Sequence, residues 1–191
     1  MQAVHDALGR PAPSLERPLP AEWKVHEGRD RYLAENGFTV AAYSDKWTPA
    51  SLFGIAFSVP NTPRHAWAIK LHDLHHVATG FGTDLTGESE ISAWEARRGL
   101  RSLGLYTGMI VFNLAIFGLL HSPRRTLRAW RISSQTATPQ AAKAQSLFGR
   151  SDLDYDALLA MSVAELRAEL RLPPHGIADQ PRRLHALAPQ R

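Results

Sequence analysis

A histidine-rich segment, HDLHH at residues 72–76, has the composition and spacing of a metal site. On a helix, His72 and His76 are one turn apart, and Asp73 lies about 100° round from His72. These three side chains can therefore reach one metal ion from one face of the helix. Glu88 follows after a glycine-bearing turn, and an antiparallel return of the chain would place its carboxylate opposite the histidines.

The composition limits which ligands can hold a metal. The 191 residues include no cysteine, which excludes a disulfide framework, a thiolate zinc site, an iron–sulfur cluster and a cysteine nucleophile. Imidazole and carboxylate donors without sulfur suit zinc, iron, manganese or cobalt. The predicted metal ligands are His72, Asp73, His76 and Glu88.

Two more polar residues lie close to these ligands in the pattern. Glu95 comes seven residues after Glu88, on the same helical face. It is predicted either to orient a ligand or carry a proton at the site, or to form a salt bridge with Arg97 or Arg98. His75 points about 60° to the other side of His72, so we expect it to support a ligand or to be exposed rather than to bind the metal.

Two known kinds of histidine site fit this segment poorly. Membrane di-iron desaturases and hydroxylases use HxxHH boxes, but they need about eight histidines in several boxes. The other six histidines here are scattered singly, so the ligand count excludes that class. An HD-type phosphohydrolase would need a separate upstream histidine and a downstream aspartate. His65 and Asp84 are available at a compressed spacing, and this stays as an alternative.

A third pattern matches more closely. HDxxH, eleven residues and then a glutamate resembles the signature of the Coq4 family of ubiquinone-biosynthesis proteins, and the likeness extends roughly from Pro63 to Leu172. Further segments that resemble the family are Thr83-Asp84, Gly87-Glu88, Trp94-Glu95 and the C-terminal stretch LDYDALLAMSVAELRAELRL.

The resemblance implies a mostly helical, membrane-peripheral protein with a divalent metal, usually zinc, at the four predicted ligands. It implies a lyase-type reaction, the oxidative decarboxylation at C1 of a 4-hydroxy-3-methoxy-5-polyprenylbenzoate. It also implies a non-catalytic alternative in which the protein binds a prenyl lipid and gathers other quinone-biosynthesis proteins. A homodimer is expected as well. Zinc has no redox chemistry, so activation of oxygen at the metal would require Fe²⁺ or another redox ion.

The elements that must position these residues are predicted to be helices. Thr62 and Pro63 are typical of a helix start and Gly80 of a helix end, which predicts a helix over 63–79. Asp84 or Thr86 can cap a second helix that runs to about Leu100. The predicted metal site therefore lies between two consecutive helices.

The rest of the chain is also predicted to lack strands, which gives an all-α fold in one multi-helix domain. Helix formers dominate residues 21–36, and a capping box at Ser162 and Glu165 starts a helix near the C-terminus. Residues 38–60 are expected to be irregular or short helical turns. The predicted division is an N-terminal arm (1–20), the helical domain (21–175) and a C-terminal tail (176–191).

The basic residues are unevenly distributed around an apolar segment. Residues 96–151 have nine basic residues and no acidic one, whereas the rest of the chain has 13 basic and 18 acidic residues. Residues 103–120 within this segment carry no charge and would span about 27 Å as a helix. We expect, in order of preference, a buried core helix lining a prenyl-chain tunnel, an interfacial helix, or a membrane span.

Arginines beside an apolar helix favour an anionic membrane surface as a partner. Nucleic acid is excluded as a partner because base-stacking aromatics and a recognisable motif are missing. The N-terminus lacks the order of a signal peptide, so the sequence predicts a peripheral location on the cytoplasmic face of a membrane.

Overall fold

The computed structural model describes residues 19–52, 55–135, 146–150 and 153–178. Within these ranges, residues 49–57 and 134–135 are described by their backbone alone. The predicted all-α fold is confirmed, because helices account for nearly all of the regular structure. The helices are α1 (Val25–Glu35), α2 (Pro63–Thr79), α3 (Leu85–Arg98), α4 (Gly104–His121), α5 (Pro123–Gln135), α7 (Tyr155–Ala160) and α8 (Val163–Glu169). Short 3₁₀ turns are η1 (Val40–Ser44), η2 (Arg101–Leu103) and η3 (Leu147–Gly149).

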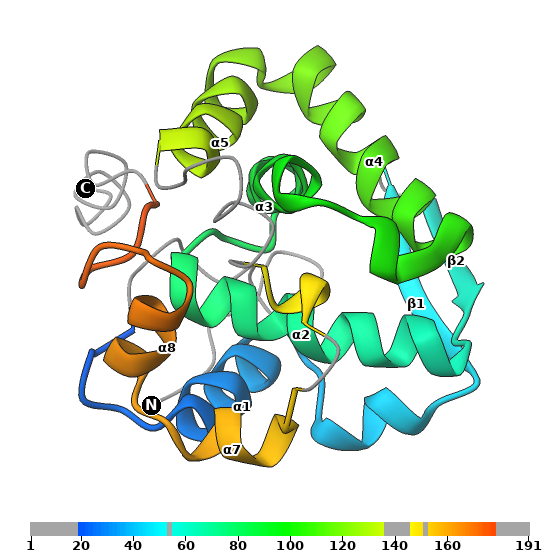
Figure 1. The fold of residues 1–191 in the computed structure, drawn as a ribbon. Helices are drawn as coiled ribbons and strands as arrows, with labels where there is room; N and C mark the ends of the chain where they lie inside the picture. The colour runs from blue at the N-terminus through cyan, green and yellow to red at the C-terminus, as the bar shows by residue number, and fades with distance from the viewer. Residues whose placement is uncertain (1–18, 53–54, 136–145, 151–152, 179–191) are drawn as a thin grey trace, which may run out of the picture.

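Helix α2 crosses the middle of the molecule and begins and ends as the sequence predicts (Figure 1). The Thr62 side chain accepts a hydrogen bond from the His65 backbone N–H, and Pro63 occupies the first turn. Gly80 ends the helix with a left-handed φ of 79°, which costs glycine little. α2 packs against α1 and α8 on one side, while α3 packs against α4 and α5 on the other.

The turn between α2 and α3 is built around a close backbone contact. Asp84 caps α3, since its side chain accepts a hydrogen bond from the Gly87 N–H at 2.7 Å. A Cβ atom at Gly87 would lie 2.1 Å from the carbonyl oxygen of Gly82, so only glycine fits there. This contact fixes the start of α3 against the end of α2 and thereby sets the position of Glu88.

The core is formed where α2 and α3 face the C-terminal helices. Trp94 of α3 is fully buried, and it packs in one cluster with apolar residues of α2 and α8. The largest buried aliphatic side chains of that cluster are Leu71, Leu74, Ile91, Leu147, Leu166 and Leu170. The capping box at Ser162 and Glu165 starts α8 as predicted.

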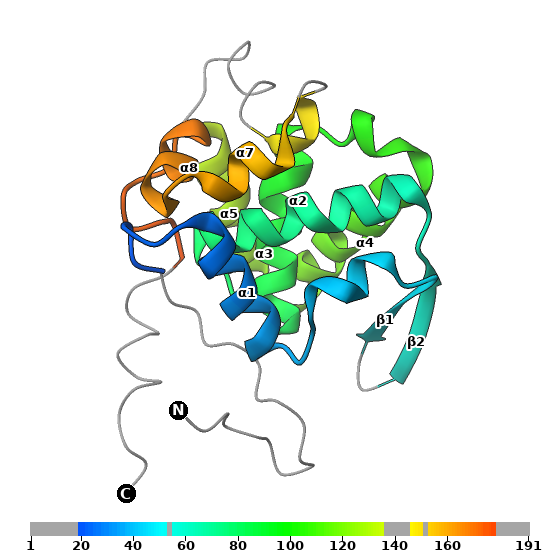
Figure 2. The same ribbon diagram turned by 90° about the horizontal axis from the view of Figure 1, so that it is seen from below.

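The prediction that the chain has no strand is wrong over residues 47–60. Strands β1 (Trp47–Leu52) and β2 (Ile55–Pro60) pair antiparallel, with Trp47 opposite Pro60. Pro49 and Pro60 argued against strands here, because proline has no backbone N–H to donate to a neighbouring strand. In a two-stranded sheet each strand has one unpaired edge, where a residue without an N–H is tolerated. The hairpin lies at one side of the helices (Figure 2).

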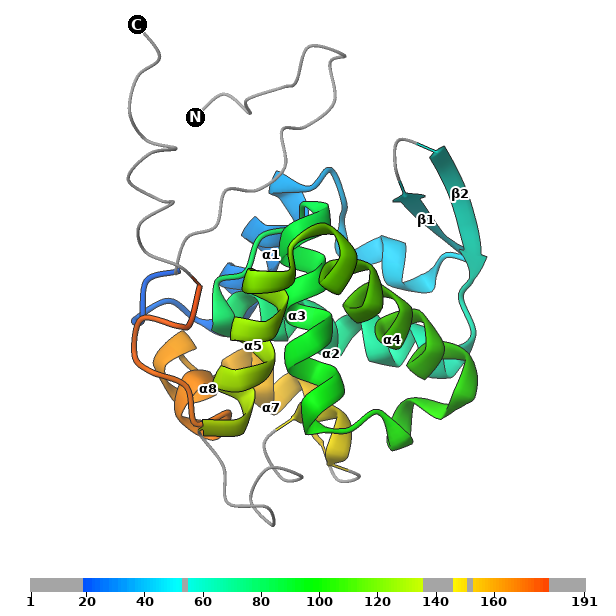
Figure 3. The ribbon, with the colours of Figure 1, turned by 90° about the horizontal axis from the view of Figure 1, so that it is seen from above.

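The expectation that the apolar segment is a buried core helix is also wrong. α4 lies at the surface beside α5 (Figure 3), and only 28% of its apolar window is buried in the structure. By length and composition alone, Arg101–His121 is apolar enough to cross a membrane. The predictions for the N-terminal arm and the C-terminal tail fall mainly on 1–18 and 179–191, which lie outside the described residues.

Candidate metal centre

Three of the four predicted ligands converge at the turn between α2 and α3. The Nε2 atoms of His72 and His76 are 3.1 Å apart. Glu88 spans both, with Oε2 at 3.3 Å from Nε2 of His72 and Oε1 at 3.3 Å from Nε2 of His76. The antiparallel return that the sequence predicts thus places Glu88 opposite the two histidines.

The hydrogen bonds on the far side of each imidazole decide which nitrogen faces the group. Nδ1 of His72 lies 2.9 Å from Oε1 of Glu95, and Nδ1 of His76 lies 3.1 Å from the carbonyl oxygen of Phe81. Both partners are acceptors, so both Nδ1 atoms carry a proton and donate it. In the neutral rings the Nε2 atoms then present lone pairs to each other and to Glu88.

Three acceptors that face one another need a cation between them. Ligand atoms about 2.05 Å from a tetrahedral zinc ion would be about 3.3 Å apart, close to the observed 3.1 and 3.3 Å separations. The outward Nδ1–H bonds match the arrangement of histidines that bind metals. His72, His76 and Glu88 therefore fit a divalent ion, and the donor set suits zinc, iron, manganese or cobalt.

The pKa values of this group also favour a positive charge among the three donors. Burial would lower the pKa of His72, but the charges of Glu95 and Glu88 raise that pKa well above its usual range. Burial would raise the pKa of both glutamates, but the neighbouring histidines lower the pKa of Glu88 strongly and that of Glu95 to about 2. The two carboxylates thus favour a positive charge at His72, which is the kind of charge that a metal ion would supply.

Asp73, the fourth predicted ligand, is not part of this group. Its helical position turns the carboxylate towards η1, where Oδ2 accepts a hydrogen bond from the Tyr43 hydroxyl at 2.5 Å. Burial raises the pKa of Asp73 to about 6, against the attraction of His72. Burial and the Asp73 charge together raise the pKa of Tyr43. Asp73 faces the same cavity as His72 and Glu88, beside the three donors rather than among them.

Glu95 occupies the supporting position that the sequence suggested as one of two alternatives. It is fully buried, and its Oε1 accepts hydrogen bonds from Nδ1 of His72 and from Nδ1 of His75, the latter at 2.7 Å. His75 is also fully buried, and its Nε2 accepts the backbone N–H of Leu147. Burial lowers the pKa of His75 despite the carboxylate beside it. The expectation that His75 supports a ligand agrees with these contacts. The alternative expectation, that His75 is exposed at the surface, is wrong.

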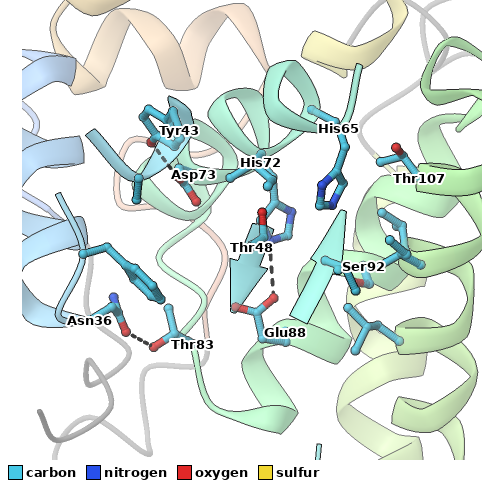
Figure 4. Close-up of a pocket in the computed structure, with 18 of the residues that line it drawn as sticks. Asn36, Tyr43, Thr48, His65, His72, Asp73, Thr83, Glu88, Ser92 and Thr107 are labelled. Atoms are coloured by element: carbon cyan, nitrogen blue, oxygen red, sulfur yellow. Dashed lines mark hydrogen bonds and ion pairs between the residues drawn. The ribbon is translucent and has the colours of Figure 1, made fainter. Parts of the chain in front are cut away.

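Two of the three donors, His72 and Glu88, line a cavity of about 610 Å³ between α2, α3, α4 and the hairpin (Figure 4). Tyr43, His72, Asp73 and Glu88 make one part of its wall polar. The inner face of α4 makes another part apolar. Its residues there are Ile110, Val111, Leu114 and Phe117. The cavity therefore suits an amphipathic ligand with an acidic or polar end and an apolar body.

Sequence reasoning missed two tyrosines of this wall, and it offered His65 only as part of an HD-type ligand set. Tyr32 stacks on His76 with ring centroids 5.0 Å apart, and Tyr43 holds Asp73. His65 lines the cavity from α2, seven residues before His72. That two-turn spacing could have identified His65 as a residue on the same helical face. No local pattern pointed to the two tyrosines, because tertiary packing brings them in.

The alternative HD-type ligand set does not form in the described residues. Asp84 is occupied in capping α3, and His65 lies outside the group of His72, His76 and Glu88. Comparison of the chain with protein-family models, with curated proteins and with solved structures gives no match in any of the three. The function must therefore be inferred from the site itself.

Proposed function

We propose that this protein is a metal-dependent enzyme of the Coq4 type, which replaces the C1 carboxylate of a polyprenylated hydroxybenzoate with a hydroxyl group. The observation that carries the proposal is one cavity with His72 and Glu88 of the metal group at its polar wall and α4 along its apolar wall. A benzoate carboxylate suits the first wall and a prenyl chain suits the second.

The protein residues would have distinct tasks in this reaction. His72, His76 and Glu88 would hold the ion, which when bound supplies positive charge for the substrate's carboxylate or phenolate and, if redox-active, electron transfer to oxygen. Asp73, with its pKa raised to about 6 and its carboxylate beside the Tyr43 hydroxyl, can exchange a proton with the ring at neutral pH. The apolar inner face of α4 keeps bulk water away from the ring.

The overall chemistry requires an oxidant. The C1–carboxylate bond breaks to release carbon dioxide, a C1–oxygen bond forms with an oxygen atom from water, and the ring loses two electrons, which would reduce dioxygen to hydrogen peroxide. We propose dioxygen as the oxidant, and zinc by itself could not activate it. We therefore propose Fe²⁺ as the ion of the oxidative reaction, and zinc as an ion that fills the same donors without redox chemistry.

We further propose that the protein works at the cytoplasmic face of an anionic membrane. The outer face of α4 exposes large apolar side chains, namely Leu105, Met109, Phe112, Ile116 and Leu120. Trp130 of α5 is exposed as well, and exposed arginines at positions 101, 124 and 131 accompany this surface. Apolar insertion combined with arginine attraction to anionic headgroups supports peripheral binding, which would bring a prenylated substrate close to the cavity.

Release of carbon dioxide tests the catalytic proposal. Full-length protein loaded with Fe²⁺ is given dioxygen and 3-geranyl-4-hydroxybenzoate that carries ¹³C in its carboxyl group. We expect labelled carbon dioxide and the matching hydroquinone from the wild type, and neither from His76→Ala. Glu90→Gln is the matched control, since Glu90 is fully buried on α3 and does not line the cavity. Product formation that is equal in wild type and His76→Ala would refute the proposal.

A non-catalytic lipid-binding scaffold is the second candidate, and the exposed outer face of α4 favours it. Such a protein would bind the geranylated probe through the apolar wall of the cavity and release no carbon dioxide. Its affinity for the probe would then be the same in the wild type and in His76→Ala.

A further inference from the structure

The cavity has polar atoms that neither the predicted metal group nor any other described residue satisfies. Nδ1 of His65, Oγ of Ser92 and Oγ1 of Thr48 are buried, and none has a hydrogen-bond partner among the residues that the structure describes. All three residues line the cavity, from α2, α3 and β1 respectively. Buried polar groups are nearly always paired, so three unpaired polar atoms in one cavity indicate that a ligand supplies the partner.

None of these three residues belongs to the metal group, and His65 and Ser92 lie beside it. His65 is two helical turns before His72, and Figure 4 shows its ring and the Ser92 side chain directed into the cavity next to His72. The His65 ring is held edge-on against Tyr106, with centroids 5.7 Å apart, so its direction is fixed by packing. We call His65, Ser92 and Thr48 the second polar patch.

The second polar patch carries no formal charge. Burial lowers the pKa of His65, and the charge of His72 lowers it further, so the imidazole is neutral at physiological pH. Ser92 and Thr48 contribute hydroxyl groups, which can either donate or accept a hydrogen bond. Neutral donors and acceptors at a dry site match an uncharged polar group better than an anion, which would lack a counter-charge there.

We propose that the second polar patch binds an uncharged hydroxyl or carbonyl substituent on the ring of the ligand. The orientation in which the ligand's acid group faces His72, His76 and Glu88 rests on the proposed function. The affinity of the patch for a hydroxyl group does not rest on it. The second polar patch would thus distinguish ligands by the substituents on their ring, which makes His65, Ser92 and Thr48 specificity-determining residues.

Two matched pairs of probes test this inference on the full-length, zinc-loaded protein. 3-Geranyl-4-hydroxybenzoate is compared with 3-geranylbenzoate, and p-cresol is compared with toluene, so each pair differs by one ring hydroxyl. Dissociation constants are measured by calorimetry or by NMR titration for the wild type, His65→Phe and Ser92→Ala. Ser89→Ala is the control, because Ser89 is equally buried on α3 but its hydroxyl already donates to the Leu85 carbonyl.

The measured quantity is the affinity ratio between the hydroxylated and the plain probe. In His65→Phe and in Ser92→Ala we expect this ratio to fall about ten-fold from the wild-type value, as one lost neutral hydrogen bond predicts. Ser89→Ala should keep the wild-type ratio. A ratio that is the same in all four proteins overturns the inference. Circular dichroism of each variant confirms that the fold is retained.

The two probe pairs separate this inference from the proposed function. Binding of p-cresol over toluene that depends on His65, without any binding of the geranylated benzoates, would support the second polar patch and refute the prenylbenzoate proposal. Tight binding of both benzoates with an unchanged affinity ratio in His65→Phe would support the prenylbenzoate proposal and refute the second polar patch.

Discussion

Substitution of Glu95 by glutamine tests the support behind the metal group. The Glu95 carboxylate is fully buried and accepts the Nδ1–H groups of both His72 and His75 on one oxygen. Its pKa of about 2, against 4.5 for a free glutamate, corresponds to about 3 kcal/mol of favourable interaction with its surroundings. That value is an upper limit for the substitution, because glutamine keeps one acceptor oxygen and loses only the charge. We therefore expect Glu95→Gln to weaken zinc binding by about ten-fold to a hundred-fold.

The zinc dissociation constant is measured by competition with a chromophoric chelator at pH 7.5. Glu90→Gln is the matched control, since Glu90 is an equally buried carboxylate on the same helix and its ion-pair partner is Arg125. It should lower the melting temperature without changing zinc affinity. Equal losses of zinc affinity in the two variants would refute the reasoning, because the effect would then be general destabilisation. Wild-type affinity in Glu95→Gln would refute it as well.

Three other predictions follow from the turn, the ligands and the exposed surface. Gly87→Ala should cost about 3 kcal/mol in urea unfolding, since its Cβ would lie 2.1 Å from the Gly82 carbonyl oxygen, and an unchanged midpoint would contradict that packing. Zinc binding at pH 7 should release a proton from His72, because the pKa of His72 is raised without the ion, so zinc affinity should increase from pH 6 to pH 8. Calorimetry in buffers of different ionisation enthalpy would detect the released proton. A zinc affinity that is the same at pH 6 and pH 8 would argue against this prediction. Phe112→Asp should reduce sedimentation with phosphatidylglycerol vesicles several-fold, whereas Trp47→Asp on the hairpin should not, and equal binding by both variants would exclude α4 as the membrane surface.

Much of the fold could be predicted from local signals in the sequence. Thr62, Gly80 and Asp84 are capping residues whose side chain or backbone freedom acts within one helical turn, and the helix ends they predict are confirmed. The convergence of His72, His76 and Glu88 also followed from local geometry, because it needs only two helices and a short turn. Predictions of this kind succeed where the controlling interactions lie close together in the sequence.

Other features depend on contacts between distant segments, and the sequence pattern did not reveal them. The helical position of Asp73 allowed it to be a ligand, but Tyr43, 30 residues away, holds its carboxylate instead. α4 lacks charge throughout, so its composition could not distinguish the face that lines the cavity from the face that is exposed. The hairpin at 47–60 has prolines that conceal strand pairing in a single sequence.

Metal content tests the central claim most directly. Wild-type protein, His76→Ala and Glu88→Ala are each equilibrated with zinc, freed of unbound metal by gel filtration and assayed by inductively coupled plasma mass spectrometry. His121→Ala, which removes an exposed histidine at the end of α4, serves as the control. We predict one zinc ion per chain in the wild type and the control, and almost none in the two site variants. Full zinc content in His76→Ala and Glu88→Ala would contradict the assignment of these residues as metal ligands.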